Sequence, residues 1–115
     1  MRLLVCGSTE FTDRDKMTHE LAKIGWKKVK VVIHGDARGA DRMAGEIAKL
    51  YKKRVKKFPA KWKLYGRAAG PIRNQKMLDK GKPNFVLAFP MENSVGTWDM
   101  VMRAKKAGVK VRVIK

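Results

Sequence analysis

The feature that most constrains this chain is a regular alternation of short, largely apolar runs with segments of helical periodicity. The runs are rich in Val, Ile, Leu and Phe, and glycine, proline or a polar residue follows most of them. Strands that alternate with helices favour right-handed βαβ crossovers and a parallel sheet covered on both faces. The predicted strands span residues 3–6, 29–33, 55–58, 85–89 and 109–114.

The segments between these runs predict four helices and one long loop. Met17, Leu21 and Ile24 recur at helical spacing after Thr12 and Asp15, which form a variant capping box. Pro71 suits the first turn of a helix, because its missing N–H group has no partner there in any case. The predicted helices run from about residue 13 to 24, 40 to 51, 71 to 80 and 96 to 107, and residues 60–70 are predicted to be loop. The expected fold is therefore one α/β domain over residues 1–115, Rossmann-like, with three layers and a mostly parallel five-stranded sheet.

Length and composition limit the class of protein. A chain of 115 residues has the usual size of one domain, and it contains no repeat, linker or low-complexity tract. No apolar run approaches the roughly 20 residues that span a membrane, and the N-terminal run ends at Gly7, too early for a signal peptide. The single cysteine, Cys6, precludes an internal disulfide. We therefore expect a cytoplasmic protein without a membrane partner, in which Cys6 is an inert core residue.

The chain is strongly basic. It has 28 Lys and Arg against 10 Asp and Glu, a formal net charge of +18, and the densest group of cations lies between Lys49 and Lys63. Such a charge favours polyanionic partners, although it also serves solubility. Nucleic-acid binding is one alternative that follows from this surface.

Ligands of parallel α/β sheets bind beyond the carboxyl ends of the strands, so the loops that follow the predicted strands are the candidate site. Glycines there let a backbone approach a ligand, hydroxyls donate hydrogen bonds, and helix N-termini bind anions. Arg73 is expected in the first turn of its helix, where a cation meets the positive end of the helix dipole and is best explained by a bound anion or a nearby carboxylate. Trp62 and Tyr65 could stack on a base or simply pack the loop. The candidate ligand-binding residues are Gly7, Ser8, Thr9, His34, Gly35, Arg38, Gly39, Asp41, Trp62, Arg73, Asn74, Gly96 and Thr97.

Several of these loops carry longer motifs: GST from Gly7, HGDARGAD from His34, FPAKW from Phe58, YGRAAGPIRN from Tyr65 and GTWDM from Gly96. Together with AFP from Ala88, they resemble the SLOG superfamily of Rossmann-like domains, and within it the small YspA, cpYpsA-related family found in bacteria and their phages. The resemblance covers nearly the whole chain. It implies a pocket for a nucleotide-derived ligand, and related proteins include phosphoribohydrolases and a DNA-processing protein.

Two departures from these relatives bear on function. Thr9 stands where the family commonly has arginine, so one cationic contact is missing. The phosphoribohydrolases have a glutamate three residues after their loop threonine, and here Met100 holds that position, three residues after Thr97. The chemistry of N-glycosidic hydrolysis calls for a positioned carboxylate.

Three functions remain open from the sequence. The preferred one is binding or sensing of a nucleotide-derived ligand, without catalysis. The second is N-glycosidic hydrolysis, with Asp99, Asp41, Glu92 or His34 as the acid. The third is nucleic-acid binding. No cofactor or metal is expected, because no Cys/His cluster has metal-ligand spacing, and a homo-oligomer stays open.

Overall fold

A five-stranded, entirely parallel sheet forms the middle of the computed structural model, which describes residues 1–115. The strands are β1 (Arg2–Gly7), β2 (Val31–His34), β3 (Arg54–Lys57), β4 (Phe85–Phe89) and β5 (Lys110–Val113). Their order in the sheet is β3-β2-β1-β4-β5. The strand order therefore reverses between β1 and β4, because the chain adds two strands on one side of β1 before it crosses to the other.

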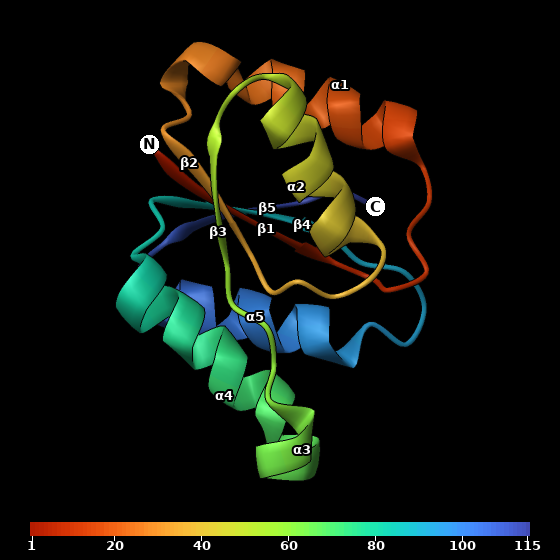
Figure 1. The fold of residues 1–115 in the computed structure, drawn as a ribbon, viewed down its shortest axis with the longest axis vertical. Coiled ribbons are helices and arrows are strands. Elements are labelled where there is room, and N and C mark those ends of the chain that lie inside the picture. The colour runs from red at the N-terminus through yellow and green to blue at the C-terminus, as the bar shows by residue number, and fades with distance from the viewer.

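Helices cover both faces of the sheet (Figure 1). The helices α1 (Arg14–Ile24) and α2 (Ala40–Leu50) lie on one face, and α4 (Ala69–Lys76) and α5 (Val95–Lys106) lie on the other. A short helix, α3 (Trp62–Tyr65), precedes α4, and a π-helical turn, Met77–Gly81, follows it. The expected α/β, Rossmann-like, three-layer fold is confirmed. None of the helices has the length and apolar character needed to cross a membrane.

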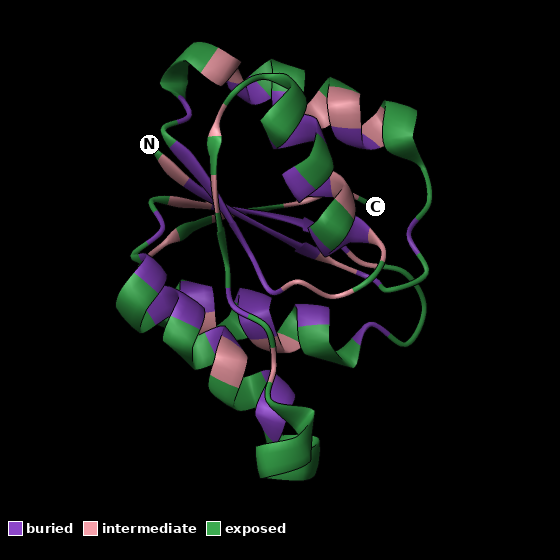
Figure 2. Ribbon diagram, viewed as in Figure 1, coloured by how far each residue is buried: buried purple, intermediate pink, exposed green.

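The core has two halves, one on each side of the sheet (Figure 2). Side chains alternate between the faces of a strand, so Leu3 and Val5 pack with α1 and α2, whereas Leu4 and Cys6 pack with α5 and the π-helical turn. Cys6 is buried, and burial raises the pKa of its thiol far above the usual range, which fits a packing role.

The predicted loop over residues 60–70 is wrong. Residues Trp62–Tyr65 form α3, Gly66–Ala68 form a 3₁₀ turn, and α4 begins at Ala69. Pro71 occupies the first turn of α4, where its missing N–H is tolerated, so it does not mark the start of the helix. Arg73 consequently lies in the last turn of α4, and the expected conflict with the positive end of the helix dipole does not arise.

Two smaller boundaries also differ from the sequence prediction. The first helix is capped by Asp13, whose carboxylate accepts a 3.0 Å hydrogen bond from the Lys16 amide, and not by Thr12. The second strand begins at Val31, because a 3₁₀ turn over Trp26–Lys28 precedes it.

Candidate functional site

The carboxyl ends of β1 and β4 lie side by side at the point where the strand order reverses. The Ser8 amide donates a 3.0 Å hydrogen bond to the Phe89 carbonyl oxygen, so the loops after the two strands leave the sheet together. Ligands of such sheets bind in the crevice beyond the carboxyl ends of the strands, where the strand order reverses. This edge of the sheet is therefore the candidate ligand-binding site.

Glycines bring the start of α2 into close contact with the loop after β1. A Cβ atom on Gly39 would lie 2.4 Å from the Ser8 carbonyl oxygen, and Gly39 also has a positive φ of 84°. A Cβ atom on Gly7 would lie 2.6 Å from that of Ala40. Both positions thus need glycine for packing between these segments, whether or not a ligand also approaches them.

Gly35 lies between two charged side chains. A Cβ atom there would be 2.3 Å from Nη1 of Arg73 and 2.9 Å from Oδ2 of Asp41. Arg73 donates a 2.6 Å hydrogen bond to the Gly35 carbonyl oxygen, and the Gly35 amide donates one of 3.0 Å to Asp41. The backbone of Gly35 therefore links a cation on α4 to a carboxylate on α2.

Asp41 is buried and holds the loop after β2 in place. Its Oδ2 atom accepts hydrogen bonds from the amides of Gly35 and Ala37, at 3.0 and 3.4 Å. Burial raises the pKa of this carboxyl to about 6, although Arg73 and the two amides oppose the rise. Asp41 also lies in the first turn of α2, where a carboxylate complements the positive end of the helix dipole.

Asn74 continues the connection from Arg73 to α5. Its side-chain oxygen accepts a 3.0 Å hydrogen bond from Nε of Arg73. Its Nδ2 atom donates to the Gly96 carbonyl oxygen at 3.1 Å and to Oδ2 of Asp99 at 2.9 Å. Asp99 in turn pairs with Arg103 at 2.8 Å. The predicted residues Gly35, Arg73, Asn74 and Gly96 therefore form one continuous network, although they come from three segments of the chain.

The first turn of α5 has no side-chain cap. The Ser94 hydroxyl accepts a hydrogen bond from the Met91 amide and not from a helical amide. The first amide of this helix that finds a backbone acceptor is that of Trp98, which donates to the Ser94 carbonyl oxygen. The amides of Val95, Gly96 and Thr97 have no protein acceptor, and the space beside Gly96 is open. Amides in this state, at a helix N-terminus, favour an anion.

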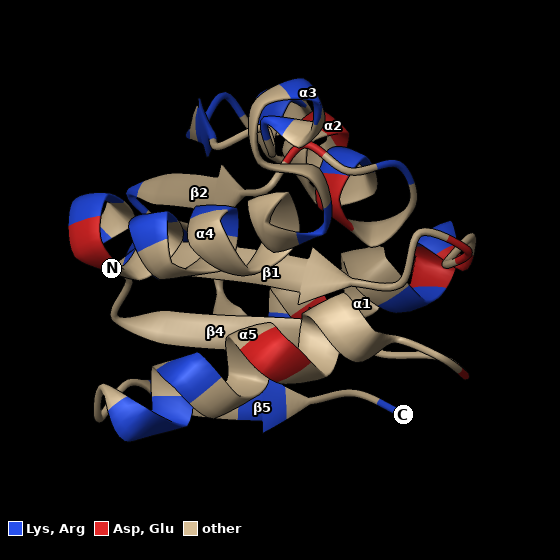
Figure 3. Ribbon diagram, turned by 90° about the horizontal axis from the view of Figure 1, so that it is seen from below, with Lys and Arg blue, Asp and Glu red and all other residues tan.

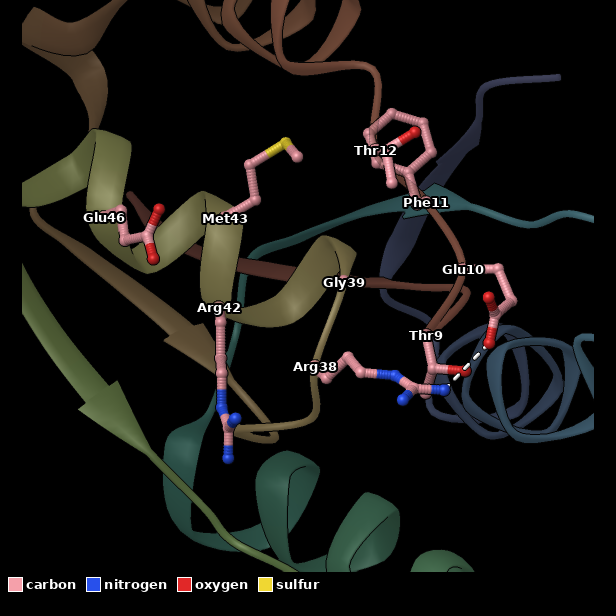
Figure 4. Close-up of a pocket in the computed structure, with 9 residues that line it drawn as sticks. All are labelled: Thr9, Glu10, Phe11, Thr12, Arg38, Gly39, Arg42, Met43 and Glu46. Carbon is pink, nitrogen blue, oxygen red and sulfur yellow. Dashed lines mark hydrogen bonds and ion pairs between the residues drawn. The ribbon is translucent and has the colours of Figure 1, made fainter.

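A broad, open depression of about 620 Å³ lies between the loop after β1 and α2 (Figure 4). It contains three predicted residues, Thr9, Arg38 and Gly39. Arg38 extends toward the loop after β1 and pairs with Glu10 at 2.8 Å, with both side chains largely exposed. An ion pair in such a position contributes little stability, so the arginine is free to exchange its partner.

His34 lies under α2, away from the network around Arg73. It is buried, its Nδ1 accepts a 2.9 Å hydrogen bond from the Asp36 amide, and its Nε2 has no partner and lies against Gly45. Burial lowers the pKa of His34 to about 4, so the ring is neutral at pH 7. With Nδ1 accepting from an amide, the proton is on Nε2.

Trp62 is separated from the strand-end loops. It lies on α3, is 59% exposed, and has its ring edge over Gly70 of α4.

The two remaining predicted residues at the end of β1, Ser8 and Gly7, are packed against α2 and β4, and the Ser8 hydroxyl accepts a hydrogen bond from the Glu10 amide. Thr97 is buried in the first turn of α5.

The sequence analysis did not predict three ion pairs near the candidate site. Glu10 pairs with Arg38, Arg42 pairs with Asp36, and Arg103 pairs with Asp99. Only the last pair has a sequence signal, because residues four apart face each other on a helix. No three His, Cys, Asp or Glu side chains lie close enough to share a metal ion.

The strand order, with helices on both faces of the parallel sheet, defines a Rossmann-like α/β domain. A family model described as the YspA, cpYpsA-related SLOG family matches residues 1–65. The chain is also 35% identical, over an alignment of 119 residues, to the Gene 61 protein of Mycobacterium phage D29, covering 96% of this chain and 93% of that protein. The chain belongs to the YspA, cpYpsA-related SLOG family. Arg73, Asn74 and α5 lie beyond the matched segment.

Proposed function

We propose that the protein binds a nucleotide or nucleotide-derived ligand, whose phosphate lies between the first turn of α5 and the loop over residues 35–39. The observation that carries the proposal is the set of amides at Val95, Gly96 and Thr97, which lack any capping acceptor. A phosphate oxygen at this position would accept from these amides and gain from the helix dipole.

The surroundings of these amides support a phosphate. Arg73 is linked to them through Asn74, and its guanidinium keeps N–H groups beyond those used by Gly35 and Asn74. The same edge of the sheet contains the reversal in strand order, where Rossmann-like domains bind nucleotides. Membership of a SLOG family adds to this argument, since the resemblance implies a nucleotide-derived ligand.

Four other predicted residues, Gly35, Arg38, Gly39 and Asp41, would shape the pocket around the phosphate. Gly35 and Gly39 keep the loop after β2 close to the loop after β1, and Asp41 fixes that loop through two amides. Arg38 can leave Glu10 for an anionic ligand, because the pair is exposed. Such a movement would supply a cation near Thr9, where the family commonly has arginine.

We propose binding without catalysis. Met100 replaces the glutamate of the hydrolase relatives and is fully buried, so no carboxylate projects from that position. The Oδ2 atom of Asp99 already accepts hydrogen bonds from Asn74 and Arg103, so this carboxylate is engaged within the protein.

One observation favours the hydrolase alternative. The pKa of Asp41 is raised to about 6, and a carboxylic acid with such a pKa can deliver a proton near neutral pH. Against this, Asp41 is buried and already accepts from two amides. Asp41 could therefore act as the acid of a hydrolase only if the loop over residues 35–39 opens.

Calorimetry with three probes tests the proposal. A nucleoside monophosphate should bind, the matching nucleoside without phosphate should bind at least tenfold more weakly, and inorganic phosphate should compete with the monophosphate. Native mass spectrometry of the purified protein would then identify a ligand that co-purifies. Equal affinity for nucleoside and monophosphate would contradict the phosphate site.

A further inference from the structure

One long segment of the chain contains no carboxylate. From residue 47 to residue 78 there is no Asp or Glu, but there are eleven Lys and Arg. It is the longest stretch of the chain without a carboxylate. The eleven cations are Lys49, Lys52, Lys53, Arg54, Lys56, Lys57, Lys61, Lys63, Arg67, Arg73 and Lys76.

This segment forms one continuous part of the surface. It begins in α2, forms the edge strand β3, and continues through α3 into α4 (Figure 1). Lys and Arg recur along α3 and α4 (Figure 3). None of the eleven cations belongs to an ion pair, whereas five other cations of the chain do. Unpaired like charges raise the local positive potential, so this surface attracts anions more strongly than a mixed one.

A depression of about 270 Å³ lies in the middle of this surface. Four cations line it, Lys57, Lys61, Arg73 and Lys76, together with the apolar side chains of Phe58, Pro59 and Ile72 and the ring of Tyr65. No carboxylate lines it. A pocket with a cationic rim and an apolar, aromatic interior suits a molecule that has both phosphates and flat rings.

Two aromatic side chains are exposed beside these cations. Trp62 is 59% exposed and Tyr65 is 44% exposed, and Leu64 between them is 66% exposed. Another tryptophan, Trp26, is instead stacked on Tyr51 with ring centroids 4.6 Å apart. Exposed rings interleaved with lysines are the arrangement that binds unpaired bases, because every base has a face on which an aromatic ring can stack.

We propose that this surface, formed by β3, α3 and α4, binds single-stranded nucleic acid. The lysines at positions 57, 61 and 76 hold successive phosphates, and Trp62 and Tyr65 stack on bases. Arg73 lines this depression and also belongs to the nucleotide site proposed above, whereas Trp62 and these lysines do not take part in that site.

The aromatic side chains distinguish a single strand from other polyanions. In a duplex the bases are already stacked on each other, so Trp62 and Tyr65 would contribute little. An acidic peptide would be satisfied by the lysines alone. The chemistry of phosphates and unpaired bases is common to DNA and RNA, and the test therefore includes both.

Fluorescence anisotropy with labelled oligothymidine and oligouridine of 15 nucleotides tests the charge contribution. The double variant Lys61→Gln/Lys76→Gln should bind at least tenfold more weakly than the wild type at 100 mM salt. Its plot of log affinity against log salt should be shallower by about 1.4, since each lost phosphate contact on a single strand removes about 0.7. The control Lys105→Gln/Lys110→Gln removes the same charge from α5 and β5 and should change affinity by no more than about twofold.

Variants of Trp62 test the stacking. Trp62→Ala should lose about five- to a hundredfold in affinity, the range for one stacked base, whereas Trp62→Phe should retain most of it. Tryptophan fluorescence should be quenched by the oligonucleotide in the wild type and much less in Trp62→Phe. Both exposed substitutions should leave the circular dichroism spectrum and melting temperature close to those of the wild type.

Four results would overturn the proposal. They are no binding at 50 mM salt, equal losses in the two double variants, tighter binding of a duplex of the same length, and equal binding of polyglutamate with the same dependence on Trp62. Tighter binding of one of the two single strands supports the proposal and identifies the natural class of strand.

Discussion

Arg73 donates a hydrogen bond of 2.6 Å to the carbonyl oxygen of Gly35, and this contact ties α4 to the loop after β2. The same arginine binds Asn74, which reaches the first turn of α5. A ligand phosphate at that turn would therefore be next to a cation that the protein already holds in place. Preorganisation of this kind reduces the entropy lost on binding.

Replacement of Arg73 by alanine should weaken nucleotide binding by about 1.5–3 kcal/mol, the scale of a charge-assisted hydrogen bond. Some stability should also be lost, because the Gly35 carbonyl oxygen loses its donor. Calorimetry on Arg73→Ala measures the affinity, with Arg67→Ala as the control, since Arg67 is exposed and unpaired. Unchanged affinity in Arg73→Ala would make this arginine purely structural.

Replacement of Gly96 by alanine should separate folding from binding. No atom lies within 4 Å of the position that its Cβ would take, and alanine has a higher helix propensity, so stability should be unchanged or rise by up to about 1 kcal/mol. The new methyl group would nevertheless occupy the open space beside the free amides and should weaken binding of a nucleoside monophosphate about tenfold or more. A variant that is as stable as the wild type and binds equally well would exclude the first turn of α5 as the phosphate site.

Asp41 and His34 should change the stability of the fold with pH in opposite directions. The folded-state pKa of Asp41, about 6, lies above the ordinary value of 3.8. The contribution of Asp41 to the free energy of unfolding is therefore fully present below about pH 4 and is lost as the pH rises to about 6. The folded-state pKa of His34, about 4, lies below the ordinary 6.5, so stability rises with pH over nearly the same range. In the wild type these two trends oppose each other.

Asp41→Asn removes only the first trend. Its free energy of unfolding should therefore rise more steeply between pH 4 and pH 6 than that of the wild type, by a difference on the order of 2–3 kcal/mol. Denaturant unfolding at several pH values measures this, and His34→Gln should show the opposite change. Parallel curves for Asp41→Asn and the wild type would mean that Asp41 has an ordinary pKa in the folded protein.

The sequence predicted the fold and most strand ends because periodicity and glycine positions are local signals. It failed over residues 60–70, which were predicted to be loop because Pro71 indicated a helix start; the helix in fact begins at Ala69, and α3 and a 3₁₀ turn precede it. The position of Arg73 was wrong for the same reason. The hydrogen-bond network through Asn74 was beyond sequence reasoning, since it joins residues that are 22 to 38 positions apart.

Incubation with nucleoside monophosphates should release little or no free base. Met100 can neither ionise nor transfer a proton, and Asp99, one residue earlier, points about 100° away around the helix. Chromatography after long incubation at high protein concentration would detect free adenine, guanine or cytosine. Base release that disappears in Asp99→Asn, Asp41→Asn or His34→Ala would establish the protein as a hydrolase.

The most direct test of the phosphate site is a titration followed by amide resonances in a ¹H–¹⁵N NMR spectrum, which a protein of 13.1 kDa gives readily. A nucleoside monophosphate should shift the amides of Gly96 and Thr97 together with the Arg73 side-chain resonance. The matching nucleoside should leave those two amides nearly unmoved, because it has no phosphate to accept from them. Saturable binding of the monophosphate with the Gly96 and Thr97 resonances unchanged would contradict the account.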